Sequence, residues 1–246
     1  MTKRREGWVN YSSVIHDVQA LVGVDTSADL SSTLPQLGRV SVQLREGSEE
    51  VLAEGDEDLM SSSVDAITSA LERQGWVKVG QILSAGQLHV YAYGPDEADI
   101  TGLDLSEVPL KPRLASGVDS GHTAYWDDLY PNPLGWTYVD NRRGLSKLEG
   151  LGEDPSIPRF VEHRFAFDSA TNATAFASEL VSQGFVSGEP RGIRDEWVVV
   201  GRKEHVVEMP AINSLTYALV RSAQEFLGGY RGWALVEQEG LGGELE

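Results

Sequence analysis

The stretch FVEHRFAF, residues 160–167, decides the fold of the C-terminal half of the chain. Apolar and polar side chains alternate along it, and successive side chains of a β-strand point to opposite faces. The alternation therefore predicts a strand with one buried and one exposed face. The buried face would carry Val161, His163, Phe165 and Phe167, and the exposed face Glu162 and Arg164.

Helical and extended patterns alternate beyond this strand. Apolar residues recur at helical spacing until Gly184, and a second such pattern begins at Pro210 and ends before Gly228. Residues 185–187 and 196–201 are extended around a turn, and residues 230–238 form a last extended stretch. The order βαββαβ predicts a ferredoxin-like domain, an antiparallel sheet with both helices on one face and the other face open.

The N-terminal half has a similar order. Strands are expected at 40–44, 76–83 and 88–93, a helix at 59–71, and a further strand at 108–115. Residues 8–11 and 14–24 could add a two-stranded extension, and residues 123–130 a short helix. The sequence thus predicts an α+β protein with two tandem domains, and the first is expected to be related to the second in its strand–helix–hairpin order.

A domain boundary is expected at Pro131-Asn132-Pro133, where turn-forming residues become dense. This gives an acidic α+β domain at 1–131 and a ferredoxin-like domain at 132–246. Leu145, Leu148 and Leu151, with basic residues between them, predict a short, basic-faced helix that leads into the second domain.

The chain carries a formal net charge of −18 and has no cysteine. A disulfide framework and cysteine zinc sites are therefore excluded, and binding to nucleic acid or to an anionic membrane is disfavoured. Residues 1–131 hold 21 acidic and 9 basic side chains, a net −12, against 17 and 11, a net −6, in residues 132–246. The acidic run at 46–58 is interpreted as a solvated loop or, alternatively, as a docking loop for a basic partner. The sequence shows no export signal or membrane span, so a cytoplasmic location is expected.

No catalytic or metal-binding motif is visible, and no cofactor is expected. The five histidines are scattered. One patch, Asp119, His122, Asp127 and Asp128, could bind a metal if its segment were helical, although such sets also arise by chance. His163 is expected to be a hydrogen-bonded core residue.

The second domain resembles the RraB family, regulators of ribonuclease E activity. The resemblance rests on PRFVEH at 158–163, on Phe176-Ala177, on Gly184-Phe185 and on GYRGW at 229–233. The first domain, with Trp126 and Leu129-Tyr130-Pro131, resembles family 695, a bacterial domain of unknown function. Arg231 departs from the RraB pattern, which has an acidic residue after the tyrosine.

The resemblance implies a regulator, not an enzyme, that binds a ribonuclease or another RNA-degrading enzyme and lowers its activity. The negative charge suits a basic protein partner. An immunity protein against a nuclease toxin, a metal-dependent hydrolase and a structural module are the alternatives, and open sheet faces could also pair in a homodimer. The expected partner-binding residues are Phe160, Glu162, Arg164, Trp197, Arg231 and Trp233, the two tryptophans only if they reach the open face.

Overall fold

The computed structural model describes residues 4, 6–15, 17–45 and 55–236. The chain divides into two compact units, Met1–Gly135 and Trp136–Glu246.

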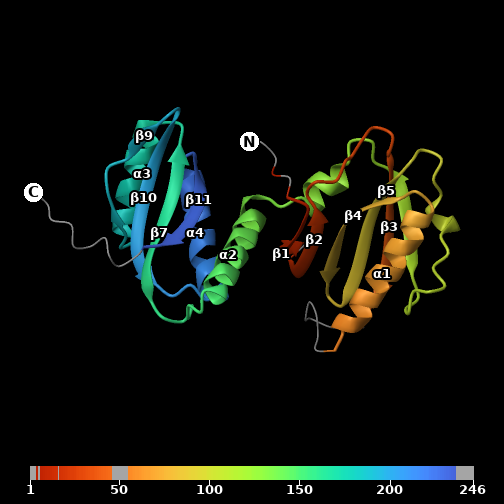
Figure 1. Cartoon of the computed structure of the whole chain (residues 1–246). Coiled ribbons are helices and arrows are strands. Elements are labelled where there is room, and N and C mark those ends of the chain that lie inside the picture. The colour runs from red at the N-terminus through yellow and green to blue at the C-terminus, as the bar shows by residue number, and fades with distance from the viewer. Residues whose placement is uncertain (1–3, 5, 16, 46–54, 237–246) are drawn as a thin grey trace, which may run out of the picture. The chain divides into compact units, whose positions relative to one another are not determined.

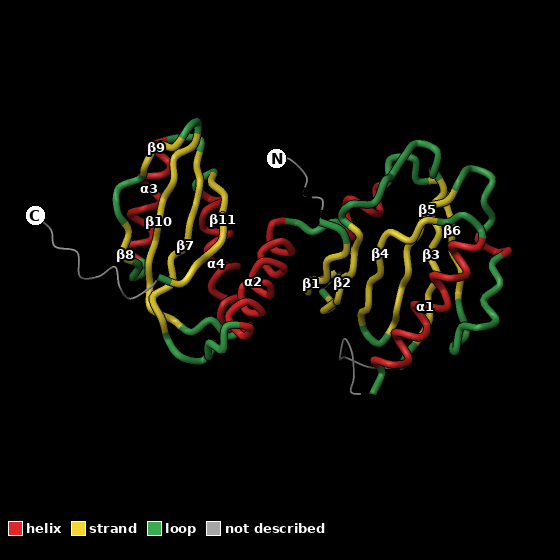
Figure 2. Tube along the Cα trace, viewed as in Figure 1, coloured by secondary structure: helices red, strands yellow, loops and turns green. Residues whose placement is uncertain are grey.

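The second unit has the predicted ferredoxin-like arrangement. Its sheet has the strand order β11-β7-β10-β8, with the short strand β9 paired to β10, and every pairing is antiparallel. Helices α3 and α4 lie on the same face of this sheet (Figures 1 and 2). The elements are β7 (Arg159–Phe167), α3 (Ala170–Ser182), β8 (Val186–Ser187), β9 (Arg191–Ile193), β10 (Glu196–His205), α4 (Met209–Glu225) and β11 (Gly228–Leu235).

The alternation of apolar and polar side chains along β7 decides which sheet face is buried and which is exposed, as the sequence predicted. Phe165 and Phe167 are almost fully buried and pack with Phe176 of α3 and Leu219 of α4. Ser169 is the N-cap of α3, and its hydroxyl accepts a hydrogen bond from the Asn172 amide. The aromatic core therefore lies between β7 and the two helices.

Helix α2 (Pro133–Gly150) is longer than the short helix that the sequence predicted. Two features explain its length. The Asn132 side chain accepts hydrogen bonds from the amides of residues 134 and 135 and so caps the helix start. Gly144 does not break the helix, because its missing side chain makes room for Trp233: a Cβ there would lie 2.8 Å from the indole ring.

The first unit contains a six-stranded sheet with the order β1-β2-β4-β5-β3-β6. The part β4-β5-β3-β6 repeats the strand order of the second unit, and the predicted extension at residues 8–24 is the hairpin β1-β2 at one edge. In the chain, the short 3-10 helix η1 comes after β5 and before β6. The elements are β1 (Trp8–Ile15), β2 (Val18–Asp25), β3 (Gln36–Gln43), α1 (Glu57–Arg73), β4 (Val77–Ser84), β5 (Gln87–Gly94), η1 (Ile100–Gly102), β6 (Arg113–Val118) and the π-helix η2 (Ala124–Leu129).

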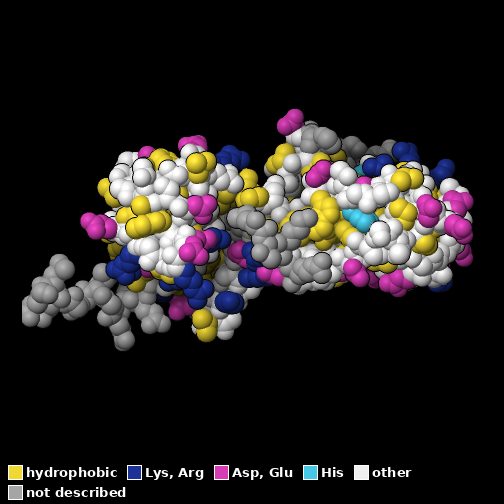
Figure 3. All heavy atoms as spheres, turned by 90° about the horizontal axis from the view of Figure 1, so that it is seen from above, with side chains coloured by type: hydrophobic (Ala, Val, Ile, Leu, Met, Phe, Trp, Pro, Cys, Tyr) yellow, Lys and Arg dark blue, Asp and Glu magenta, His cyan; other side chains and the backbone are white. Residues whose placement is uncertain are grey.

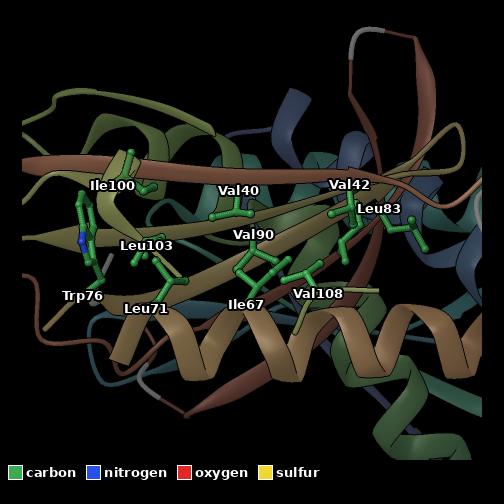
Figure 4. Close-up of a cluster of buried hydrophobic side chains, with 12 residues drawn as sticks. Val40, Val42, Ile67, Leu71, Trp76, Leu83, Val90, Ile100, Leu103 and Val108 are labelled. Carbon is green, nitrogen blue, oxygen red and sulfur yellow. The ribbon is translucent and has the colours of Figure 1, made fainter. Parts of the chain in front are cut away.

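The main core of the first unit lies between α1 and the sheet (Figure 4). Ile67 and Leu71 of α1 meet Val90 of β5 there, and Trp76 closes one end. Val108 joins this core from the connection before β6, so the strand predicted at 108–115 is wrong in its position: β6 begins at Arg113. An apolar residue can be buried by a loop as well as by a strand.

The acidic run at 46–58 lies mostly outside the described residues. Its last members, Glu57 and Asp58, occupy the first turn of α1, where carboxylates favour the positive end of the helix dipole. Among the described residues, no helix is both long and apolar enough to cross a membrane.

Candidate protein-binding surface

The open face of the sheet in the second unit is formed by the alternate residues of β7 and β10. Residues that face each other across antiparallel strands share one face. Glu162 lies opposite Arg202, and Phe160 lies opposite Glu204. These side chains point away from the core that Phe165 and Phe167 form with the helices.

Glu162 is the centre of this face, because it binds two arginines. Arg164 donates from Nε to Oε1 at 2.7 Å, and Arg202 donates from Nε and Nη2 to Oε2 at 3.0 and 2.8 Å. The Glu162 side chain is only 11% exposed, whereas those of Arg164 and Arg202 are 61% and 51% exposed. The carboxylate is thus covered by its two partners, which remain open to solvent.

The ionisation of Glu162 follows from these contacts. Burial opposes the charged form, but the hydrogen bonds and charges of Arg164 and Arg202 outweigh it and lower the pKa of the Glu162 carboxyl below its usual value. Glu162 is therefore ionised at neutral pH, and the cluster of three side chains keeps a net charge of +1.

Apolar side chains lie on the same face as this cluster. Phe160 is 41% exposed, and Val186 and Ile193, which pair with Arg202 and Glu196 of β10, are 71% and 53% exposed. Figure 3 shows Lys and Arg side chains gathered on one side of the second unit among scattered acidic ones. The open face thus combines exposed apolar groups with arginines, a composition typical of protein interfaces.

The structure does not bring all predicted contact residues to this face. Arg231, at the β-bulge of β11, does reach it: its guanidinium pairs with Glu196, which lies on the open face opposite Ile193, and both side chains are about half exposed. Trp197 shares the helix-covered side with Phe167 and is 37% exposed at the margin. Trp233 also lies on that side, where its indole N–H donates to Asn141.

Sequence reasoning missed three residues of the face: Arg202, Val186 and Ile193. The predicted strand ended at Gly201, whereas β10 continues to His205 and brings Arg202 beside Glu162. Continuing the alternation of residues 196–201 by one step would have placed Arg202 on this face, although not beside Glu162. β8 and β9 have two and three residues, too short for a periodic signal.

His163 is the buried, hydrogen-bonded core residue that the sequence predicted. Its Nδ1 lies 2.9 Å from the Tyr230 hydroxyl, its Nε2 lies 3.0 Å from Nε2 of His205, and Nδ1 of His205 lies 2.7 Å from the carbonyl of Val206. A carbonyl only accepts, so neutral His205 carries its proton on Nδ1 and its Nε2 accepts from His163. The Tyr230 hydroxyl then donates to His163, and all three bonds run in one direction.

Burial, and then the neighbouring His205, lower the pKa of His163 to about 3. Burial also lowers the pKa of His205 and raises that of Tyr230. All three side chains are therefore neutral at physiological pH. They hold β7, β10 and β11 together beneath the open face.

The acidic patch predicted in the first unit has a structural role at Asp119. Its carboxylate accepts hydrogen bonds from the Tyr93 hydroxyl and from the amides of Thr123 and Ala124, at 2.6, 2.8 and 3.0 Å, and so holds the start of η2. Burial opposes ionisation of Asp119, but these bonds outweigh it and lower its pKa. His122 instead contacts the carbonyl of Leu34. The described residues hold no group of three or more His, Asp or Glu side chains that could bind a metal.

The second unit is therefore a ferredoxin-like domain with one open sheet face. The family model described as "Regulator of ribonuclease activity B", RraB, matches residues 139–234. The match begins in α2 and ends in β11, so it spans the whole open sheet and its two helices. It confirms the RraB resemblance of this part, while the resemblance of the first unit to family 695 stays a prediction. No curated protein matches the chain.

Proposed function

We propose that this protein is a regulator that binds a ribonuclease through the open sheet face of its second unit and lowers the activity of that enzyme. The match of residues 139–234 to a family described as regulating ribonuclease activity carries the proposal. The face formed by β7 and β10 lies entirely within the matched residues. A sheet face with exposed Phe160 and two arginines supplies the contact surface.

The charge of the chain supports a protein partner with a basic surface. A net charge of −18 repels RNA and attracts the basic surfaces with which ribonucleases hold RNA. Most of this excess lies in residues 1–131, so the first unit would steer the encounter. Regulation would then follow from occupying the enzyme and would require no chemistry by this chain.

The test is affinity capture of the tagged full chain from its native cell extract at low and at raised salt, followed by mass spectrometry. We expect a ribonuclease or a protein of its assembly to be captured, and more weakly at raised salt. Purified protein should then slow cleavage of a fluorogenic RNA by ribonuclease E. Absence of both binding and inhibition would refute the proposal.

A matched pair of valines locates the contact. Val186 on the open face is 71% exposed, and Val181 on α3 is 56% exposed on the opposite side of the unit. Val186→Asp is expected to weaken binding about tenfold, because it replaces an exposed apolar contact with a carboxylate that lies opposite Arg202 and competes for its guanidinium. Val181→Asp should bind like the unchanged protein. Equal effects of the two substitutions would place the contact elsewhere.

A further inference from the structure

The cluster of Glu162, Arg164 and Arg202 on the open face is basic in a strongly acidic chain. Arg164 and Arg202 share one carboxylate, so one positive charge remains on the cluster, whereas the chain as a whole carries −18. Pairing with Glu162 therefore leaves the cluster able to bind a further anion.

The bonds to Glu162 leave most of the guanidinium donors available. Arg164 uses only its Nε–H, and Arg202 uses Nε and Nη2. Among the described residues, no other hydrogen bond from these two groups is observed. A guanidinium has five N–H donors, and its fork matches a carboxylate in two parallel bonds. Glu162 thus orients both arginines while their outer N–H groups face solvent.

We infer that Arg164 and Arg202 form a carboxylate-binding site, which receives an Asp or Glu side chain from an acidic segment of the ribonuclease partner. This inference rests on the proposed function and names the chemistry of its contact. Glu162 is a positioning residue, since it fixes the arginines and does not touch the partner. Phe160 and the exposed Val186 cover the partner segment on either side of the arginines.

A protein carboxylate fits this site better than the other anions. RNA binding requires many cations along a strand, and a chain of charge −18 repels such a polyanion. A second copy of this chain docking face to face would bring two basic clusters toward each other, which disfavours association. A single carboxylate beside apolar groups meets neither obstacle.

The first experiment measures the affinity of the full chain for purified ribonuclease E by titration calorimetry. We expect Arg164→Ala and Arg202→Ala each to weaken binding about tenfold or more, the loss of charge-assisted hydrogen bonds. Arg221→Ala, an exposed arginine of α4, is the matched control and should leave the affinity unchanged. Arg202→Lys should also weaken binding, because an ammonium lacks the fork.

Removing both arginines would leave Glu162 buried without a partner and could unfold the unit. The triple variant Glu162→Gln, Arg164→Gln, Arg202→Gln removes all three charges together and keeps the test valid. If the unchanged chain binds and this triple variant binds equally well, the inference is overturned and the proposed function stands. If the unchanged chain neither binds ribonuclease E nor captures another ribonuclease, the proposed function itself fails.

The second experiment identifies the occupant. A photoreactive benzoylphenylalanine at position 160 is cross-linked in the presence of ribonuclease E, and the attached peptide is sequenced by mass spectrometry. An attached ribonuclease peptide with Asp or Glu supports the inference. Attachment to a second copy or to residues 237–246 of this chain, which include four glutamates, would overturn it. So would tight binding of a labelled single-stranded RNA that is lost in the triple variant.

Discussion

His163 should make the stability of the second unit depend on pH between about 7 and 5. The folded unit holds its imidazole neutral with a pKa of about 3, against an ordinary value of 6.5 in the unfolded chain. Below pH 6.5 the unfolded chain binds a proton that the folded unit does not, so stability is complete above this pH and is lost as the pH falls toward 3. For these two values the loss at pH 5 is about 2 kcal/mol.

The comparison variant is His163→Gln, whose amide can still donate to His205 but does not titrate in this range. The assay is hydrogen exchange of the β7 and β10 amides, which reports the opening of the second unit alone. Between pH 7.5 and 5, the unchanged protein should lose about 2 kcal/mol more of its opening free energy than the variant does. Titrating groups that do not contact residue 163 contribute in both proteins and cancel, and the glutamine amide keeps the hydrogen bond to His205. Equal losses would refute the assignment of a neutral, buried His163.

Three further substitutions test the packing of the same unit by denaturant unfolding. Tyr230→Phe should cost about 1 kcal/mol, since Nδ1 of His163 loses its donor, but should keep the pH dependence. Asn141→Ala should cost about 1–3 kcal/mol, because its buried amide bridges α2 to α4 and β11. Gly228→Ala should cost about 2 kcal/mol, since its new methyl group would lie 2.0 Å from the Phe167 ring; a stability equal to that of the unchanged protein would contradict the packing.

The fold of the second unit was predictable because its signals are local. The alternation in β7 and the helical spacing of α3 and α4 each lie within one short window. The contacts of Trp233 were not predictable, because its partner Asn141 lies 92 residues away. Only the tertiary structure decides that this tryptophan packs against α2 instead of facing a partner. Gly144 is a second example. A glycine disfavours a helix, yet here its missing side chain lets Trp233 pack against α2.

The candidate surface was half predictable for a related reason. The alternation along β7 alone places three predicted residues on the open face: Phe160, Glu162 and Arg164. Arg202 comes from another strand, and its place beside Glu162 depends on the register between β7 and β10. The alternation within one strand can be read from its sequence. The register between β7 and β10 cannot, because α3, β8 and β9 separate these two strands in the chain. The cluster could therefore be assembled only from the structure.

The sign of the net charge is a poor guide to the sign of the contact surface. The acidic excess of the first unit acts by long-range attraction during the encounter, and salt weakens this attraction because it screens charges over about 8 Å at physiological ionic strength. At contact, the groups within a few ångströms matter most, and in the Glu162 cluster of the open face these are the guanidiniums of Arg164 and Arg202. In the proposed complex, salt would therefore act mainly on the rate of association. Removing the arginines would act mainly on the rate of dissociation, because that rate depends on the hydrogen bonds formed after docking.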